Sequence, residues 1–191
     1  MTATREQDVV ELLVDQHNQI RRLFSEMDGA QGDRKREVFE DLVRLLAIHE
    51  TAEEEVVHPV AGRRIEGGQK IVEERLHEED QAKHMLAELY DLGPDKPEFD
   101  VRFQALKNAV IQHAEREEQQ EFSTLREKVD KDTLKRMADA VRAAEKTAPT
   151  RPHPRTPESA VGNILAGPPL AVFDRVRDKM RELVKSGKGN R

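Results

Sequence analysis

Histidine and glutamate are the residues whose spacing in this sequence most clearly predicts chemistry. A helix turns about 100° per residue, so His17 lies within about 60° of apolar neighbours such as Leu13 and Ile20. The same count places His49 and His113 at the centres of apolar stripes in later segments. Leu or Val would normally occupy such positions in a soluble helical bundle. Three inward imidazoles therefore predict a site between the helices.

Two glutamates share these faces. Glu53 follows His49, and Glu117 follows His113, at a spacing of four residues that places each pair on one side of a helix. A buried carboxylate is costly unless a cation compensates its charge, and a pair of divalent or trivalent metal ions would do so. Carboxylate oxygens with imidazole nitrogens suit iron or manganese, and zinc less well. The pattern predicts two metal ions held by His and Glu.

The third helical segment adds a further candidate ligand, Glu79. Its apolar stripe includes Leu76 and Tyr90 and is centred on Glu79, whereas His77 and His84 lie about 140–160° from that centre. We expect the Glu79 carboxylate to point inward and both imidazoles to point outward. A rotation of this helix would instead make His77 or His84 the ligand.

Other kinds of site fit the sequence less well. The chain has no Cys, which excludes thiolate nucleophiles, Fe–S clusters and Cys-ligated zinc. The Glu-x-x-His spacing of ferritin-like sites occurs at Glu55 and His58 and again at Glu74 and His77, but the angle count places both pairs on the outer face. We expect His58, which precedes Pro59, to be a helix-end residue. No Gly-rich phosphate loop is present.

Five segments with helical apolar spacing must position these residues, joined by short Gly- or Pro-containing turns. They cover about residues 8–27, about 33–58, the stretch between Gly67-Gly68 and Gly93-Pro94, a stretch after Pro97, and about 132–146. We expect an all-α domain over residues 1–146, an up-down-up-down four-helix bundle with a short fifth helix. Residues 147–191 are expected to be a Pro-rich linker and a basic amphipathic helix.

The charge divides in the same way. The chain has 191 residues and a net charge of −6. Residues 1–146 hold 23 basic and 34 acidic residues, a net −11, whereas residues 147–191 hold 9 and 4, a net +5. With neither a signal-like segment nor a long apolar run, we expect a cytoplasmic protein without membrane or nucleic-acid binding. The C-terminal helix is predicted to contact the bundle, another copy or a protein partner.

The order of these motifs resembles the hemerythrin-like, or HHE cation-binding, domain of bacterial proteins. The residues that carry the resemblance are His17, the run His49-Glu50-Thr51-Ala52-Glu53, the third-helix carboxylate and the run His113-Ala114-Glu115-Arg116-Glu117, within about residues 9–125. The resemblance implies two non-haem iron ions, with His17 and His49 on one, His113 on the other, and Glu53 and Glu117 bridging them. Glu50 is a weaker ligand candidate.

Two departures from the family pattern bear on the activity. Oxygen carriers of the family have a His pair on the third helix where this chain has Glu79 and Lys83, which could instead form an ordinary surface ion pair. They also have an Asp five residues after the fourth-helix His, where this chain has Glu117 at four. A site richer in oxygen favours oxidised iron and peroxide. We expect reaction with hydrogen peroxide or dioxygen, and in particular a catalase-like disproportionation of hydrogen peroxide. The alternative is a sensor of iron, oxygen or nitric oxide that acts through residues 147–191.

Overall fold

An elongated antiparallel bundle of helices forms the part of the chain described by the computed structural model, residues 7–145. Its elements are α1 (Val9–Gly29), α2 (Gly32–Ala52), the π-helical segment η1 (Glu53–Val57), α3 (His58–Arg64), α4 (Gly68–Leu92), α5 (Phe99–Arg116), the π-helical segment η2 (Glu117–Phe122), α6 (Ser123–Lys128) and α7 (Lys131–Glu145). All elements in this part of the chain are helical, as the sequence predicts. The predicted linker and basic helix at 147–191 lie outside the described residues.

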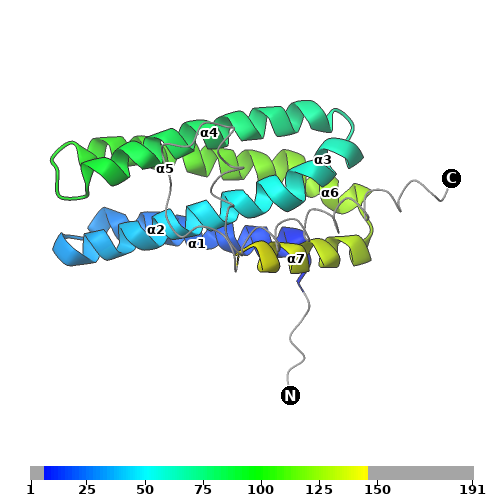
Figure 1. Ribbon diagram of the computed structural model, residues 1–191, viewed down its shortest axis with the longest axis horizontal. Helices are drawn as coiled ribbons and strands as arrows, with labels where there is room; N and C mark the ends of the chain where they lie inside the picture. Colours follow the sequence, from blue (N-terminus) through cyan, green and yellow to red (C-terminus); the bar gives the residue numbers. More distant parts are fainter. Residues whose placement is uncertain (1–6, 146–191) are drawn as a thin grey trace, which may run out of the picture.

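The nine elements make four long helical rods and one shorter helix (Figure 1). The second rod is α2, η1 and α3 in succession, and the fourth is α5, η2 and α6. Contacts join α1 to α2, α4 to α5 and α3 to α4, and α7 lies against α1 and α2. This arrangement confirms the four-helix bundle with a short fifth helix.

The helix ends follow from local chemistry. Asp8 caps α1, because its carboxylate accepts a hydrogen bond from the Glu11 backbone N–H at 2.8 Å. Gly67 has φ of 70° in the turn before α4, a conformation that other residues rarely adopt. A Cβ at Gly68 would lie 2.4 Å from the Ala61 carbonyl oxygen, so glycine is required where α3 and α4 meet. The Gly pair predicted as a turn therefore sets the approach of two rods.

The sequence predicts that the second helix closes near Pro59 and Gly62, and the rod runs a little past both. Pro59 lies in the first turn of α3, and the rod continues to Arg64. A proline is tolerated there because its missing N–H falls beside a π-helical segment, where the regular hydrogen-bond ladder is already interrupted. The second rod therefore places buried residues in the core both before η1, such as His49, and after it, such as His58.

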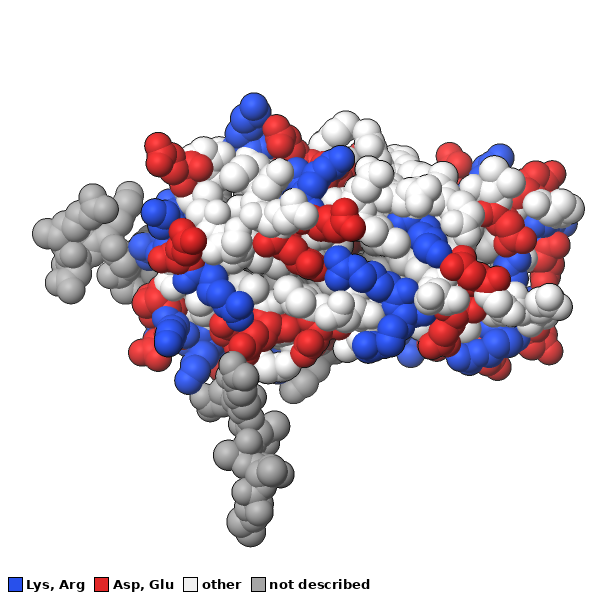
Figure 2. Space-filling view, turned by 180° about the vertical axis from the view of Figure 1, so that it is seen from behind, with Lys and Arg blue, Asp and Glu red and all other residues white. Residues whose placement is uncertain are grey.

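Two apolar clusters fill the bundle. One lies toward α3, α6 and α7 and includes Val9, Leu13, Val56, Val60, Phe122, Leu125, Leu134, Met137 and Val141. The other lies toward the opposite end and includes Ile20, Phe24, Leu42, Leu46, Ala82, Leu86, Phe103, Leu106 and Val110. Within the described residues, no helix is long and apolar enough to cross a membrane. Acidic and basic side chains are interspersed over the face in Figure 2.

Candidate metal centre

A buried polar layer separates the two apolar clusters. Each long rod contributes to it at the point where its stripe passes from one cluster to the other: His17 on α1, His49 at the end of α2, Glu79 on α4 and His113 near the end of α5. Glu53 and Glu117 are the first residues of η1 and η2, and both side chains are fully buried. The inward placement predicted for all six side chains is confirmed.

These side chains form two groups that share a pair of carboxylates. His17, His49, Glu53 and Glu117 each offer one ligand atom, and these atoms lie within 4.8 Å of one another. Glu53, Glu79, His113 and Glu117 form a second such group with the same limit. Glu53 and Glu117 belong to both groups, so the geometry fits two cations side by side with these carboxylates between them.

Each of the three histidines uses its Nδ1 atom to bond outward. His17 Nδ1 lies 2.8 Å from Glu118 Oε1, His49 Nδ1 lies 2.7 Å from Gln16 Oε1, and His113 Nδ1 lies 3.0 Å from Glu78 Oε2. Because these acceptors bear no hydrogen, each Nδ1 donates a proton to its acceptor and each Nε2 atom faces inward. The rings are thus oriented with a metal-ligating nitrogen toward the shared carboxylates.

The inward atoms lack hydrogen-bond partners among residues 7–145. These atoms are Nε2 of His17, His49 and His113, both carboxylate oxygens of Glu53 and of Glu117, and Oε2 of Glu79. Each Nε2 lies 3.3 Å from an oxygen of Glu53 or Glu117, but without the geometry of a hydrogen bond. Buried polar groups in native proteins are nearly always paired, and a group left unpaired costs about 1–3 kcal/mol. Eight such atoms facing one another are the observation that most directly fits bound cations.

The pKa values of these groups reflect burial among like charges. Burial, followed by Glu117 and Glu79, raises the pKa of Glu53 well above its usual value. Burial also raises the pKa of Glu117, but His113 and His17 outweigh it and hold that pKa well below its usual value. Burial, reinforced by His17, lowers the pKa of His49. These opposed shifts show that the charges of these groups depend on one another, and a bound cation would favour the ionised form of both carboxylates.

His58 and Glu121 belong to this layer and were missed as site residues. His58 Nε2 lies 2.7 Å from Glu79 Oε1, and its Nδ1 lies 3.0 Å from Glu121 Oε1, with all three side chains buried. Burial lowers the pKa of His58, but its hydrogen bonds to Glu121 and Glu79 outweigh burial and raise it to about 10. The expectation of a helix-end residue on the outer face is wrong, because η1 changes the phase of the helix after Glu53.

Glu50 lies outside both groups of ligand atoms. It is buried, and its Oε2 atom lies 3.8 Å from the Lys83 ammonium. Burial raises the pKa of Glu50 to about 8. Lys83 also contacts Glu54 and lies 3.8 Å from Glu79 Oε2, so the predicted ion pair of Glu79 with Lys83 is present although Glu79 also faces the site.

Two histidines and two apolar residues lie on the outer face of α4. His77 and His84 are exposed, and they contact Gln81 and Asp80 on their own helix. Leu76 and Tyr90 are exposed, so their assignment to the inward stripe is wrong. Arg75 on the same helix is buried instead, with its Nη1 atom 3.3 Å from Glu78 Oε2.

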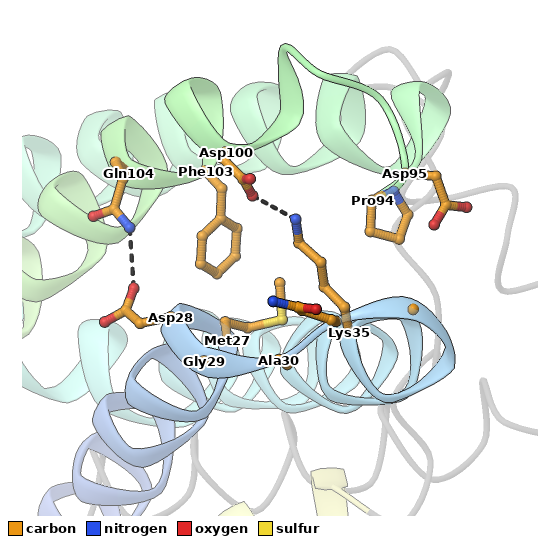
Figure 3. Close-up of a pocket in the computed structure, with 12 residues that line it drawn as sticks. Met27, Asp28, Gly29, Ala30, Lys35, Pro94, Asp95, Asp100, Phe103 and Gln104 are labelled. Atoms are coloured by element: carbon orange, nitrogen blue, oxygen red, sulfur yellow. Dashed lines mark hydrogen bonds and ion pairs between the residues drawn. The ribbon is translucent and has the colours of Figure 1, made fainter.

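A surface hollow of about 550 Å³ lies at the end of the bundle away from α7, between the α1–α2 turn and the start of α5 (Figure 3). Two pairs cross it: the Lys35 ammonium lies 2.5 Å from Asp100, and the Gln104 amide donates to Asp28 at 3.0 Å. It shares no residue with the buried layer. The candidate centre is therefore inside the bundle, not in this hollow.

Comparisons with known proteins place the chain in a family. A DNA nickase of Nostoc sp. is 29% identical over 140 residues, and the match spans 73% of this chain but 38% of that protein. A hemerythrin-like protein of Schizosaccharomyces pombe is 28% identical over 138 residues, 72% of this chain and 68% of that protein. A hemerythrin HHE cation binding domain-containing protein from Mycobacterium kansasii has the same fold, with a TM-score of 0.66 at 19% identity over 89% of this chain and 99% of that one. The family model of the hemerythrin HHE cation binding domain matches residues 8–125, and the chain belongs to that family.

Proposed function

We propose that this protein binds two iron ions in the buried layer and disproportionates hydrogen peroxide to water and dioxygen. The observation that carries the proposal is the set of unpaired inward atoms, arranged as two groups that share Glu53 and Glu117. In this proposal His17 and His49 hold one ion, and His113 and Glu79 hold the other. Oxygen and imidazole donors of this kind suit iron, with manganese next.

Two bound iron ions would supply neighbouring redox centres that exchange electrons with peroxide. Disproportionation converts two molecules of hydrogen peroxide into two of water and one of dioxygen, so it needs no other oxidant or reductant. The chain itself excludes bulk water, because apolar clusters cover both ends of the layer. It also fixes the ligands, because Glu118, Gln16 and Glu78 hold the imidazoles.

The ligand set favours this reaction over reversible dioxygen carriage. The second group of atoms contains one imidazole, from His113, with three carboxylates. Carboxylates stabilise the more highly charged, oxidised metal ion better than neutral imidazoles do. A site of this composition is suited to cycle through oxidised states with peroxide.

The alternative of a sensor depends on residues 147–191, which lie outside the described part of the chain. DNA nicking is not proposed, because the match covers 38% of the Nostoc protein that bears that name. Peroxide chemistry is therefore the function that the described residues support best.

Metal analysis combined with oxygen measurement tests the proposal. We expect the purified protein to contain about two iron ions per chain, to absorb through ligand-to-metal charge transfer, and to release dioxygen from hydrogen peroxide. His49→Ala should lose metal and turnover, whereas His84→Ala, at an exposed histidine, should retain both. A folded protein that takes up no metal, or a His49→Ala variant that turns over peroxide normally, would refute the proposal.

A further inference from the structure

The buried layer is closed on most sides by apolar residues or by anchored charges. The two apolar clusters cover it along the bundle axis. Beyond His17, Glu118 is held by Arg21 at 2.9 Å. Beyond His113, Glu78 contacts both Arg75 and Arg116. A planar guanidinium holds a carboxylate in a fixed geometry, so the arginines keep Glu118 and Glu78 in place on these two sides.

On the side between α2–η1 and α4, a half-exposed lysine lies next to the layer. The Lys83 ammonium contacts the Glu54 carboxylate and lies 3.8 Å from both Glu50 Oε2 and Glu79 Oε2. The exposed fractions of these side chains are 43% for Lys83, 37% for Glu54, 8% for Glu50 and 0% for Glu79. The four residues thus form a continuous line of ionisable side chains from solvent to the layer.

Glu79 provides a second, independent indication that a cation is expected here. Its carboxylate is fully buried, and its Oε2 atom has no hydrogen-bond partner within the described residues. The same carboxylate belongs to one of the two groups of ligand atoms. The lysine ammonium therefore lies beside a carboxylate that also faces the proposed metal position.

We propose that Glu50, Glu54 and Glu79 form the path by which a divalent cation reaches the buried layer, and that the Lys83 ammonium occupies this path until the cation displaces it. The inference rests on the proposed metal binding and adds its route. A lysine suits the role because its side chain is flexible and its half-exposed ion pairs are weak. The lysine ammonium is positively charged at neutral pH, so it competes with the incoming metal for the same carboxylates.

Uptake of ferrous ion by metal-free protein, under anaerobic conditions, tests the path. Timed samples would be desalted rapidly and analysed for iron. We expect Lys83→Gln to take up iron about tenfold faster than the unmodified protein, because no ammonium then competes with the cation for the carboxyl groups of the path. Lys83→Arg should not accelerate uptake, and Glu54→Gln should slow it several-fold. The final iron content should be unchanged in all three variants, because neither Lys83 nor Glu54 is among the grouped ligand residues.

Lys107→Gln is the matched control. Lys107 pairs with Asp28 at 2.6 Å, away from the layer, and its substitution changes the net charge by the same amount. Equal uptake rates for Lys83→Gln and Lys107→Gln would overturn the path while leaving metal binding intact. Faster uptake by Arg116→Gln but not by Lys83→Gln would place the opening beside Glu78 instead. An unmodified protein that binds no iron would overturn the proposed function together with the path.

Discussion

At the scale of single residues, the main feature of the site is that the two nitrogens of each candidate ligand imidazole have different surroundings. Nδ1 of His17, His49 and His113 bonds outward, and Nε2 is left unpaired toward the shared carboxylates. His58 differs, because both of its nitrogens contact carboxylates. The first three suit metal ligation, whereas His58 compensates the charges of Glu79 and Glu121.

Glu53 should destabilise the protein when no metal is present. Both of its oxygens are buried without hydrogen-bond partners in the described part of the chain. We expect Glu53→Leu to raise the free energy of unfolding by about 1–3 kcal/mol in chelator, and to abolish metal binding. Urea unfolding measures the first effect and metal analysis the second. Glu40→Leu, at an exposed position on α2, should change stability by less than about 0.5 kcal/mol. A Glu53→Leu variant less stable than the parent in chelator would contradict this account.

His58 should stabilise the protein whether or not metal is bound. We expect His58→Leu to lower the free energy of unfolding by about 3–5 kcal/mol, because Glu79 and Glu121 lose their buried cationic partner. Chemical denaturation checks the value. The exposed His84, substituted by Leu, serves as the control and should be nearly neutral. A small effect of His58→Leu would mean that the two carboxylates are neutralised in another way.

At the scale of elements, the two π-helical segments explain both the site and the error about His58. Each begins at a shared carboxylate, η1 at Glu53 and η2 at Glu117. In a regular α-helix, His58 would lie roughly 180° from His49. The wider turn of η1 reduces the rotation between them to about 80°, which brings His58 inward. π-Helical segments often occur at functional sites, and here both lie beside the buried layer.

The short α7 contributes to the site through its last residue. Glu145 contacts the Gln16 amide, and Gln16 in turn accepts the hydrogen bond from His49. At the start of α7, Asp130 accepts hydrogen bonds from the Thr133 backbone N–H at 2.9 Å and from its hydroxyl at 2.8 Å. The capping of α7 therefore supports an element that helps to orient His49.

Asp130→Ala should cost about 1 kcal/mol of stability, whereas Asp130→Asn, which can still cap the helix, should cost less. The hydrogen bonds from Thr133 lower the Asp130 pKa from its usual 3.8. Because the pKa is lowered, the contribution of ionised Asp130 to stability is complete at pH values above the usual 3.8. It disappears as the pH falls through the lower pKa of the folded protein. Denaturation of parent and Asp130→Ala at several pH values should show a difference that is constant near neutrality and shrinks in acid. A difference that grows in acid would contradict the assignment.

At the scale of the whole molecule, the fold places a charged layer between two apolar clusters. The clusters supply the burial that holds the bundle together, and the layer interrupts that burial on every long rod. Metal binding should therefore link directly to stability, because the ligands converge in the folded chain and separate in the unfolded one.

Removing metal should lower the melting temperature. At a free metal concentration about 1,000 times the dissociation constant, binding contributes about 4 kcal/mol, which corresponds to about 10 °C for a domain of this size. Calorimetry with and without chelator measures the shift. Glu53→Leu, which should not bind metal, should show no shift with chelator. An equal shift in both proteins would mean that the chelator acts in some other way.

Deleting residues 147–191 separates the peroxide reaction from the sensor alternative. All the grouped ligand residues lie between His17 and Glu117, so we expect iron content and dioxygen release to remain within about twofold of the full chain. Iron analysis and an oxygen electrode provide the comparison. A deletion variant that keeps its iron but loses a metal-dependent interaction with another protein would favour the sensor.

The sequence by itself determined the helices, the bundle and the inward faces of His17, His49, Glu53, Glu79, His113 and Glu117. It could do so because apolar spacing in regular helices reports directly which side is buried. Tertiary structure decided the rest. The π-helical segments change the helix phase in a way that residue spacing does not reveal, so His58 was placed on the wrong side. The Nδ1 partners and the Lys83 contacts join residues distant in sequence, and only the packing of rods against one another brings them together.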